Sequence, residues 1–351
     1  MQKKPTTSGH DNGLRLLVAM PALNEEATVG DVISRVPREI PGISRVEVLV
    51  VNDGSTDKTP QIAAEAGAHV INHSSSLGVG AAFQSALSFA IEQGMDLIAT
   101  IDSDGQFNPA DIPKLIEPIV NDEADFTTAS RFKDKNLIPD MTGVKLWGNR
   151  MMSRLITRLT IRQTGQRFFD VSCGMRGYNR RAMLQLNLLG EFTYTQEVFL
   201  NLAFKRMRIV EVPIKVRGIR EFGKSRVASN LFKYAFNTSR IIFRSYRDYH
   251  PLRFFGWAAA SLAAPGFGLL IFLVTHYFMS GGFSPHKWAG FTGGGLLALS
   301  LMVLHMGIIG DMMNRHRIYL EELLFHVRQN TLPPLHHRDT GQSPDGDSDA
   351  R

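Results

Sequence analysis

Two long stretches without a charged side chain constrain the fold of this chain more than any other feature of its sequence. One runs from Phe254 to Met279 and the other from Trp288 to Gly310. A helix that crosses a bilayer needs about 20 apolar residues, and both stretches exceed that length. Because only residues 280–287 separate them, we expect a hairpin of two membrane-spanning helices within residues 251–310.

Positive side chains flank the expected hairpin. Arg244, Arg247 and Arg253 precede it, Arg315, Arg317 and Arg328 follow it, and the loop between the two stretches carries only Lys287. The positive-inside rule places both flanks in the cytoplasm. The sequence therefore predicts a multi-pass protein of the inner (cytoplasmic) membrane, with its water-soluble part and both termini in the cytoplasm.

Composition narrows the possible partners of the chain. Its 351 residues include 39 Lys and Arg against 33 Asp and Glu, a net charge of +6, and a single cysteine, Cys173. One cysteine excludes an internal disulfide and a Cys-rich zinc site. The mild positive excess by itself could serve an anionic substrate or a membrane surface as easily as nucleic acid; from the sequence as a whole we expect no nucleic-acid partner. The polar ends, residues 1–13 and 331–351, are predicted to be disordered.

The segment 227–250, just before the first span, has two distinct faces when drawn as a helix. Lys233, Arg240, Arg244 and Arg247 share one face, and Leu231, Ala235, Ile242 and Tyr246 form an apolar stripe. This pattern predicts an amphipathic helix lying on anionic headgroups; an ordinary surface helix of the soluble part is the alternative. A cytoplasmic helix is expected at residues 311–330, after the second span.

Residues 14–226 alternate strand-like and helix-like segments. The apolar runs Leu14–Met20, Val46–Val51 and Leu97–Ile101 are typical of buried parallel strands, and His69–Asn72 is a weaker one. Helical segments are expected at residues 25–35, 59–66, 81–92 and 112–120, between and after these strands. The rhythm predicts an α/β domain with a doubly wound, mostly parallel sheet.

Polar clusters end three of the expected strands, at residues 21–26, 52–57 and 102–106. In sheets of this kind, ligands lie beyond the carboxyl ends of the strands, so the three clusters should line one crevice. No G-x-G-x-x-G follows the first strand and the chain has no G-x-x-x-x-G-K-[ST]. Their absence counts against a dinucleotide enzyme and a P-loop NTPase.

The third cluster contains two carboxylates, Asp102 and Asp104, on either side of one residue. In an extended segment both side chains point the same way. Two hard oxygen ligands at a strand end suit Mg²⁺ or Mn²⁺ shared with the phosphates of a substrate. A lone D-x-D is more often a solvated turn, but a buried strand before it and a second acidic cluster beside it favour a metal site.

Three motifs resemble family 2 glycosyltransferases with the GT-A fold: P-A-L-N-E-E after the first strand, V-N-D-G-S-T-D after the second and D-S-D-G-Q after the fourth. Three later motifs, A-S-R-F at 129–132, D-V-S-C-G-M-R-G-Y at 170–178 and G-K-S-R at 223–226, narrow the resemblance. With two C-terminal spans, the chain is similar to polyprenyl-phosphate glycosyltransferases of the dolichyl-phosphate-mannose-synthase-like branch. The resemblance covers about residues 14–328 and implies a GT-A Rossmann-like sheet over residues 14–226.

The resemblance implies a role for individual residues. The nucleotide-sugar would contact Pro21, Ala22, Asn24, Glu26, Asp53, Gly80, Asp102 and Ser103, with Asp53 accepting an N–H of the base. Asp102, Asp104 and Gln106 would hold Mg²⁺ or Mn²⁺. Arg131, Lys224 and Arg226 would bind the phosphate of the lipid. Asp104, Arg131 and Glu197 would be catalytic, Glu197 by orienting a sugar hydroxyl or the shell of the metal.

The implied reaction is inverting transfer of one sugar from a UDP- or GDP-linked donor to a membrane polyprenyl phosphate, undecaprenyl or dolichyl. The chain departs from the family at Ser76, where Asn is usual, and at Val79, where a basic residue is common. A processive polysaccharide synthase is an alternative, but none of the three tryptophans stands in a Q-x-x-R-W motif. A non-catalytic membrane scaffold of the same fold is another alternative. Separately, the small residues of the hairpin would allow the chain to form a homo-oligomer.

Overall fold

The computed structural model describes residues 13–187, 195–218, 239–240, 243–244 and 246–331. They belong to two units, one formed by residues 1–230 with 325–351 and the other by residues 231–324. The two tails, which the sequence predicts to be disordered, lie outside the described residues apart from Gly13 and Thr331. Most of the expected interfacial helix at 227–250 lies outside them as well.

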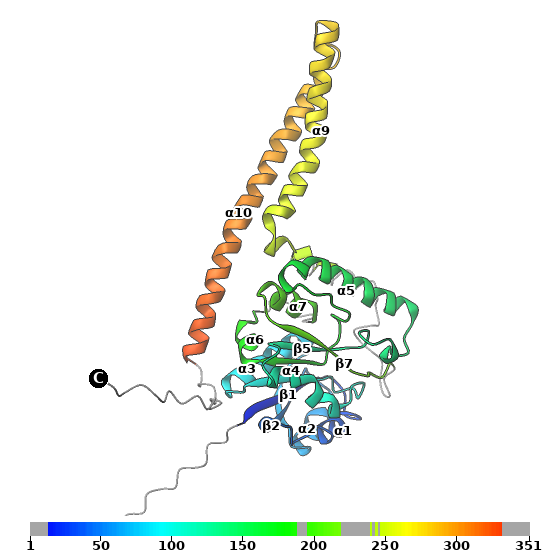
Figure 1. Cartoon of the computed structure of the whole chain (residues 1–351), viewed down its shortest axis with the longest axis vertical. Coiled ribbons are helices and arrows are strands. Elements are labelled where there is room, and N and C mark those ends of the chain that lie inside the picture. Colours follow the sequence, from blue (N-terminus) through cyan, green and yellow to red (C-terminus); the bar gives the residue numbers. More distant parts are fainter. Residues whose placement is uncertain (1–12, 188–194, 219–238, 241–242, 245, 332–351) are drawn as a thin grey trace, which may run out of the picture. The chain divides into compact units, whose positions relative to one another are not determined.

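The first unit is built on one seven-stranded sheet with the order β3-β2-β1-β4-β6-β5-β7. Figure 1 shows this sheet among its helices, with β1, β2, β5 and β7 labelled. The strands are β1 (Leu14–Ala22), β2 (Ile43–Asn52), β3 (His69–Asn72), β4 (Leu97–Thr100), β5 (Phe126–Ser130), β6 (Arg176–Asn179) and β7 (Ile209–Pro213). β6 runs antiparallel to both of its neighbours, and the other pairings are parallel. The predicted mostly parallel α/β sheet is confirmed.

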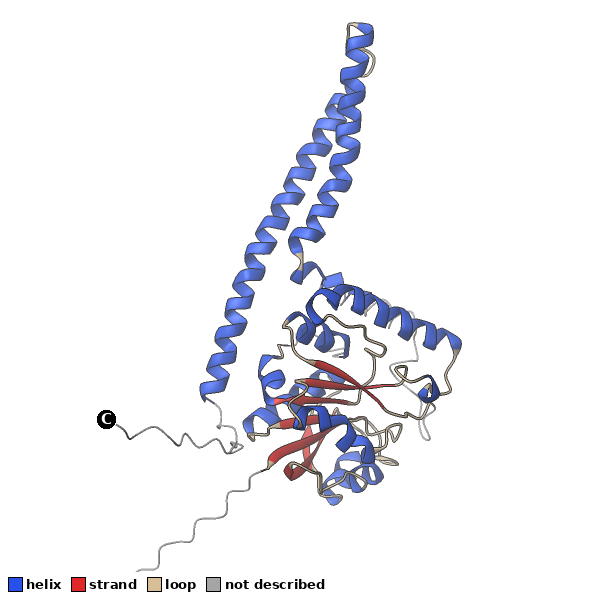
Figure 2. Ribbon diagram, viewed as in Figure 1, coloured by secondary structure: helices blue, strands red, loops and turns tan. Residues whose placement is uncertain are grey.

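Helices connect these strands (Figure 2). They are α1 (Val29–Ser34), α2 (Thr59–Glu65), α3 (Val79–Glu92), α4 (Ile112–Val120), α5 (Gly143–Thr164), α6 (Arg180–Gln185) and α7 (Thr195–Phe204), with short 3₁₀ turns at Pro109–Asp111 and Lys135–Leu137. The first four occupy the predicted places. α1 begins later than predicted, because residues 25–28 form a turn closed by the Glu25 carbonyl oxygen.

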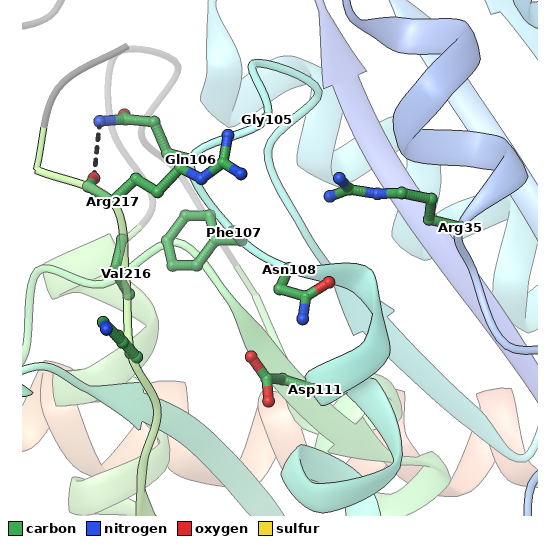
Figure 3. A pocket seen from close by; sticks show the side chains of 9 residues that line it. Arg35, Gly105, Gln106, Phe107, Asn108, Asp111, Val216 and Arg217 are labelled. Atoms are coloured by element: carbon green, nitrogen blue, oxygen red, sulfur yellow. Dashed lines mark hydrogen bonds between the residues drawn. The ribbon is translucent and has the colours of Figure 1, made fainter. Parts of the chain in front are cut away.

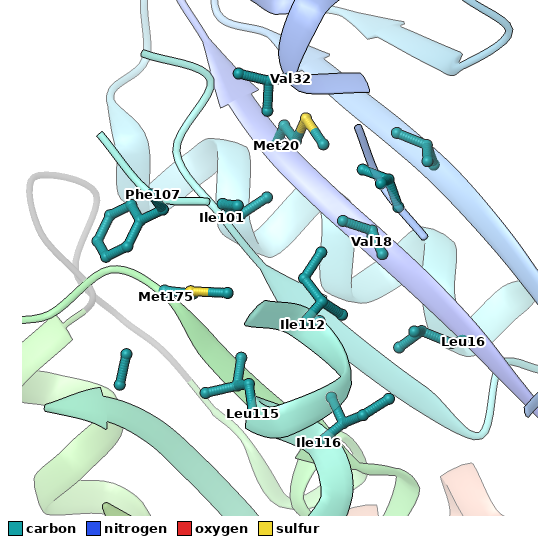
Figure 4. Close-up of a cluster of buried hydrophobic side chains, with 14 of the residues drawn as sticks. Leu16, Val18, Met20, Val32, Ile101, Phe107, Ile112, Leu115, Ile116 and Met175 are labelled. Atoms are coloured by element: carbon teal, nitrogen blue, oxygen red, sulfur yellow. The ribbon is translucent and has the colours of Figure 1, made fainter. Parts of the chain in front are cut away.

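The hydrophobic core covers both faces of the sheet. Leu16, Val18 and Met20 on β1 pack in a cluster with residues of α1 and α4 (Figure 4). Leu17 and Ala19 are equally buried and point to the opposite face, because successive side chains of a strand alternate. On that face α3 packs against β1 and β2. Each large apolar side chain buried in this way contributes about 1.5–3 kcal/mol.

The second unit contains α9 (Pro251–Ser280) and most of α10 (Lys287–Thr331). Both helices are long and apolar enough to cross a membrane. Their outward side chains include Phe278 and Phe291, both more than 80% exposed. α10 continues past the second uncharged stretch without a break, so the helix expected at 311–330 is its final part.

Glycines let α9 and α10 approach closely. A Cβ atom on Gly293 would lie 2.9 Å from the Gly266 carbonyl oxygen, and one on Gly266 would lie 3.2 Å from the Gly293 carbonyl oxygen. Nearby, the Ser300 hydroxyl donates to the Ala259 carbonyl oxygen at 2.8 Å. Small residues and side-chain hydroxyls of this kind hold helices together in lipid, where the hydrophobic effect does not. The small residues thus serve the contact within the hairpin.

Candidate active site

The loops after β1 and β2 are joined at the carboxyl edge of the sheet. Asn24 Oδ1 accepts a hydrogen bond from the Thr56 backbone N–H at 2.8 Å, and the Asn24 N–H donates to Ser55 Oγ at 2.9 Å. Asn24 has a positive φ of 53°, a conformation that asparagine tolerates better than most residues. Glu26 Oε2 adds a bond from the Lys58 N–H at 3.1 Å. Asn24 and Glu26 therefore shape the predicted crevice.

The loop after β4 is fastened to the loop after β1 through Ser103. The Ser103 hydroxyl donates to the Pro21 carbonyl oxygen at 2.8 Å, and the Thr28 hydroxyl donates to the Ser103 carbonyl oxygen at 2.7 Å. Ser103 is almost fully buried, as is Ala22 at the end of β1. Ser103 thus positions the two loops, and the three strand-end clusters predicted from the sequence do meet at one edge.

Asp53 lies at the end of β2 and organises the loop of residues 73–78. Its carboxylate accepts hydrogen bonds from the backbone N–H groups of Leu77 and Gly78, both at 2.9 Å, and from the Ser76 hydroxyl at 2.9 Å. His73 Nδ1 lies 2.8 Å from Asp53 Oδ1. Burial alone would raise the pKa of Asp53, but these hydrogen bonds outweigh it and hold the pKa below its usual value. The carboxylate is ionised at neutral pH.

The base-binding role expected for Asp53 requires a change in this loop. Four groups already occupy the carboxylate, which offers about four acceptor positions. An N–H of a base would have to replace one donor, and the Ser76 hydroxyl is the one that can rotate away. Gly80, which the sequence assigned to the donor site, lies buried in the first turn of α3 just after this loop.

The sequence predicted an extended segment for the Asp102–Asp104 pair. The structure shows a turn there instead. β4 ends at Thr100 and the chain turns at Ser103 and Asp104. The turn forms because Asp104 Oδ1 accepts the Gln106 backbone N–H at 3.0 Å and Gly105 takes a positive φ of 73°. Strand alternation therefore does not set the directions of the two carboxylates.

The Asp102 carboxylate lies against Gly174. A Cβ atom on Gly174 would be 3.0 Å from Asp102 Oδ2 and 3.2 Å from Oδ1, so a side chain there would crowd the carboxylate. The Thr100 hydroxyl holds the Gly174 carbonyl oxygen at 2.9 Å. The loop of residues 170–175 is thus in contact with Asp102, the first member of the acidic pair.

The donor set of this edge fits a hard divalent cation. Asp102 and Asp104 supply carboxylate oxygens, the ligands that Mg²⁺ and Mn²⁺ prefer. Among the described residues, no group of three or more His, Cys, Asp and Glu side chains is placed to hold a metal. The two carboxylates thus have the chemistry of ligands for such a cation. Gln106, the third predicted ligand, donates through Nε2 to the Arg217 carbonyl oxygen at 3.2 Å.

Arg131 follows β5 and forms a two-bond fork with Asp170. Its Nε lies 2.6 Å from Oδ2 and its NH2 lies 2.9 Å from Oδ1, and the Arg131 backbone N–H also donates to Oδ2 at 3.0 Å. Asp170 is completely buried, whereas the side chain of Arg131 keeps 16% exposure. The planar guanidinium is thereby fixed in one orientation.

Glu211 on β7 holds the loop that carries Asp170. Its carboxylate accepts the Asp170 N–H at 2.7 Å and the Phe169 N–H at 2.9 Å. Burial raises the pKa of Glu211 above its usual value, although these two backbone hydrogen bonds oppose the rise. We did not predict Glu211 as a site residue. The available signal was an acidic residue at an inward position of the apolar strand Ile209–Pro213.

A cavity of about 360 Å³ lies beside the loop after β4 (Figure 3). Gln106 and Arg217 border it, and the Arg217 N–H donates to the Gln106 carbonyl oxygen at 3.0 Å. Arg35 and Lys215 add two further cations to its lining. Arg217 therefore lies next to the acidic loop.

Three predicted residues lie in later parts of the chain. Glu197 lies half-buried in the first turn of α7, where Arg176 NH1 donates to the Thr195 carbonyl oxygen at 2.8 Å. Lys224 and Arg226, the other two residues expected to bind the lipid phosphate, lie outside the described residues. Their roles stay predictions.

Comparisons with known proteins agree with this geometry. The family described as glycosyl transferase family 2 matches residues 17–186. A dolichyl-phosphate hexose transferase of Haloferax volcanii is 30% identical over 203 residues, which cover 58% of this chain and 82% of that protein. A dodecaprenyl-phosphate galacturonate synthase of Rhizobium johnstonii is 26% identical over 316 residues, covering 86% of this chain and 88% of that protein.

A solved structure shows the same fold. It is glucosyl-3-phosphoglycerate synthase of Mycobacterium tuberculosis in complex with Mn²⁺, UDP-glucose and phosphoglyceric acid, with a TM-score of 0.52 and 21% sequence identity. The match covers 70% of this chain and 85% of that one. Strand order, strand-end acids and relatives all lead to one conclusion: the chain belongs to glycosyltransferase family 2 and is a glycosyltransferase with the GT-A fold.

Proposed function

We propose that this glycosyltransferase moves one sugar from a nucleotide-sugar to the phosphate of a membrane polyprenol, with inversion at the anomeric carbon. One observation carries the proposal: the loop of residues 170–175 contacts both an arginine suited to the acceptor phosphate and a carboxylate suited to the metal of the donor. At one end Asp170 fixes the guanidinium of Arg131, and at the other Gly174 lies against the carboxylate of Asp102. A cation for the acceptor phosphate and an acidic pair for the donor thus share one short loop.

The donor side rests on the acidic pair. Asp102 and Asp104 would hold Mg²⁺ or Mn²⁺, which when bound neutralises the charge of the departing nucleoside diphosphate. The structural neighbour from M. tuberculosis was crystallised with Mn²⁺ and UDP-glucose, which supports a divalent cation and a nucleotide-sugar. Pro21, Ala22, Asn24, Glu26 and Asp53 would border the nucleotide, because they form the adjoining loops of the same edge.

The acceptor side rests on Arg131 and on the relatives. The relatives from H. volcanii and R. johnstonii are named for dolichyl-phosphate and dodecaprenyl-phosphate, and two helices of this chain are apolar enough to cross a membrane. A guanidinium presents five N–H donors in a fixed planar arrangement, and this arrangement suits phosphate oxygens. Lys224 and Arg226 would add positive charge.

The chemical step then needs no strong base. An oxygen of the acceptor phosphate is already ionised at neutral pH, and it forms the new bond to the anomeric carbon as the bond to the nucleoside diphosphate breaks. Arg131 would hold the attacking phosphate in line, which is the positioning contribution to catalysis, and Glu197 would orient a hydroxyl of the sugar. The products are a nucleoside diphosphate and a polyprenyl-phosphate sugar of inverted configuration.

The test combines substitution at Asp104 with a panel of substrates. The full chain in native membranes is given radiolabelled UDP- and GDP-sugars with short- and long-chain polyprenyl phosphates, with and without EDTA. We expect one donor to yield a lipid-extractable product. NMR should show that its anomeric configuration is inverted relative to the donor. EDTA should stop transfer, and added Mn²⁺ or Mg²⁺ should restore it.

Asp104→Asn should abolish transfer, because it removes one of two carboxylates in the acidic pair. Asp122→Asn is the matched control: it makes the same change at a side chain that is 81% exposed and at a positive φ of 58° that asparagine tolerates, and transfer should persist. Near-normal turnover by Asp104→Asn would refute the metal-binding role. A long polymer as product, or no transfer from any donor, would refute the proposed reaction.

A further inference from the structure

The outer face of α5 carries a stripe of apolar side chains that the fold leaves uncovered. Of the seven large hydrophobic residues exposed within the described part of residues 13–218, five lie on this helix: Val144, Trp147, Met151, Leu155 and Ile161. Trp147 is 63% exposed and Val144 is 61% exposed. Residues 144, 147, 151 and 155 recur at helical spacing and form one stripe.

The opposite face of the same helix already has its partners. Met152, Ser153, Ile156 and Thr160 are buried, and α5 packs against α7. The helix therefore has two apolar faces, and only one of them belongs to the domain core. A contiguous apolar patch on a water-soluble surface marks a place of interaction.

Positive charge borders the stripe. Arg150, Arg154, Arg158 and Arg162 follow one another at four-residue intervals, and Lys145 adds a fifth cation, whereas residues 143–164 contain no acidic residue. Like charges four residues apart destabilise a helix by about 0.2–0.5 kcal/mol for each pair. A row of such pairs is an unfavourable choice for a surface that faces only water, and it becomes favourable against an anionic surface.

We propose that the outer face of α5, the stripe of Val144, Trp147, Met151 and Leu155 with its four arginines, lies on the anionic headgroups of the membrane. An interfacial helix combines an apolar face, a basic border and an aromatic residue at headgroup level. With 22 residues, α5 is about 33 Å long. The two candidate spans begin at Pro251 of the same chain, so the domain cannot leave the neighbourhood of a bilayer that they cross.

A second copy of the chain fits this face less well. A two-fold contact would bring the same patch of each subunit together, and four arginines would then face four arginines without an acidic residue on either helix. Anionic lipid supplies the missing negative charge. The proposal concerns a surface of the catalytic domain and does not depend on which sugar or acceptor the enzyme uses.

Fluorescent labelling at single cysteines tests the proposal on the full chain in lipid nanodiscs. Burial raises the pKa of the Cys173 thiol to about 12, so the native cysteine does not compete for the label. Bimane is attached at Met151→Cys on the stripe and, as the matched control, at Glu65→Cys on the exposed side of α2. The nanodiscs contain phosphatidylcholine alone or with phosphatidylglycerol, and a nitroxide on the lipid headgroup quenches nearby bimane.

We expect strong quenching at position 151 with phosphatidylglycerol, weaker quenching without it, and none at position 65. An arginine near an anionic surface contributes about fivefold to surface affinity. Changing Arg150, Arg154, Arg158 and Arg162 to Gln should therefore abolish the phosphatidylglycerol-dependent quenching. Changing four exposed arginines elsewhere, Arg35, Arg38, Arg45 and Arg181, should leave it intact.

Two outcomes would overturn the proposal. Bimane at position 151 that is no more quenched than at position 65 would show that the stripe faces water. Bimane at position 151 that is shielded from water but insensitive to the lipid nitroxide, in particles holding two copies of the chain, would show that a second copy covers the stripe instead.

Discussion

Among single residues, Arg131 depends on a series of buried partners. Glu211 holds the backbone of residues 169 and 170, and Asp170 in turn holds the guanidinium. Asp170 is completely buried, so an unpaired carboxylate there would be costly. The series explains how a long, rotamer-rich side chain is held in one orientation.

Arg131→Lys should impair use of the acceptor. Lysine offers a compact charge in place of a planar fork, so one charge-assisted bond is lost, worth about 1.5–3 kcal/mol. Transfer should fall by about 10- to 150-fold, which is measured as kcat/KM for the polyprenyl phosphate, together with the KM for the nucleotide-sugar. The matched control is Arg208→Lys, which alters an arginine that bridges Asp122 and Asp125.

The kinetic pattern separates a role in binding from a role in stability. A loss confined to the polyprenyl phosphate, with the KM of the donor unchanged, supports phosphate binding by Arg131. A lowered melting temperature with unchanged kinetics would assign Arg131 to the architecture of the loop alone.

Among elements, the hairpin of α9 and α10 contains adjacent glycines whose surroundings differ. Gly293 faces α9 so closely that a Cβ atom would meet the Gly266 carbonyl oxygen at 2.9 Å, whereas a Cβ atom on Gly294 would meet nothing within 4 Å. The sequence shows a run of three glycines and does not distinguish them. Their different surroundings make a matched pair of substitutions possible.

Gly293→Leu should separate the two helices, because overpacking a close contact costs about 1–3 kcal/mol. Ala259→Cys with Ser300→Cys reports on the contact, since the Ser300 hydroxyl lies 2.8 Å from the Ala259 carbonyl oxygen. Disulfide formation between these cysteines in membranes should slow when Gly293→Leu is added and stay unchanged with Gly294→Leu. Equal rates for both variants would show that close packing at Gly293 does not hold the hairpin.

For the whole molecule, the proposed topology places residues on opposite sides of a bilayer. Ser284 lies between α9 and α10, and Lys58 lies exposed after β2. In sealed membrane vesicles with the cytoplasmic side outward, Lys58→Cys should react with a bulky maleimide, because the positive-inside rule predicts that the positive flanks and the domain before them lie on the cytoplasmic side. Ser284→Cys should react only after detergent is added. Labelling of both cysteines without detergent would contradict a hairpin that crosses the bilayer.

Much of the parallel half of the sheet was predictable from sequence, because buried parallel strands such as Leu14–Met20 are continuous apolar runs. β6 was missed because its four residues, Arg176–Asn179, include a buried arginine and form no such run. α5 was missed because apolar side chains on two faces hide its helical period. In both segments the apolar period that marks a strand or a helix is therefore missing from the sequence.

The candidate site was likewise predictable only in part. The strand-end acids Asp53, Asp102 and Asp104 could be placed at one edge because parallel topology brings strand ends together. The turn at Ser103 and the supporting role of Glu211 could not, since each depends on a hydrogen bond to a backbone group whose position only the folded chain defines.

The ion pair of Arg131 and Asp170 joins residues 39 positions apart in the chain, and α5 lies between them. The ion pair therefore closes residues 131–170 at the base of this segment. The outer surface of the segment can be rewritten for a different leaflet composition while the ion pair, and with it the chemistry, stays the same. If the same segment is taken from a relative that works in another membrane, the chimaera should change its lipid preference and keep its reaction.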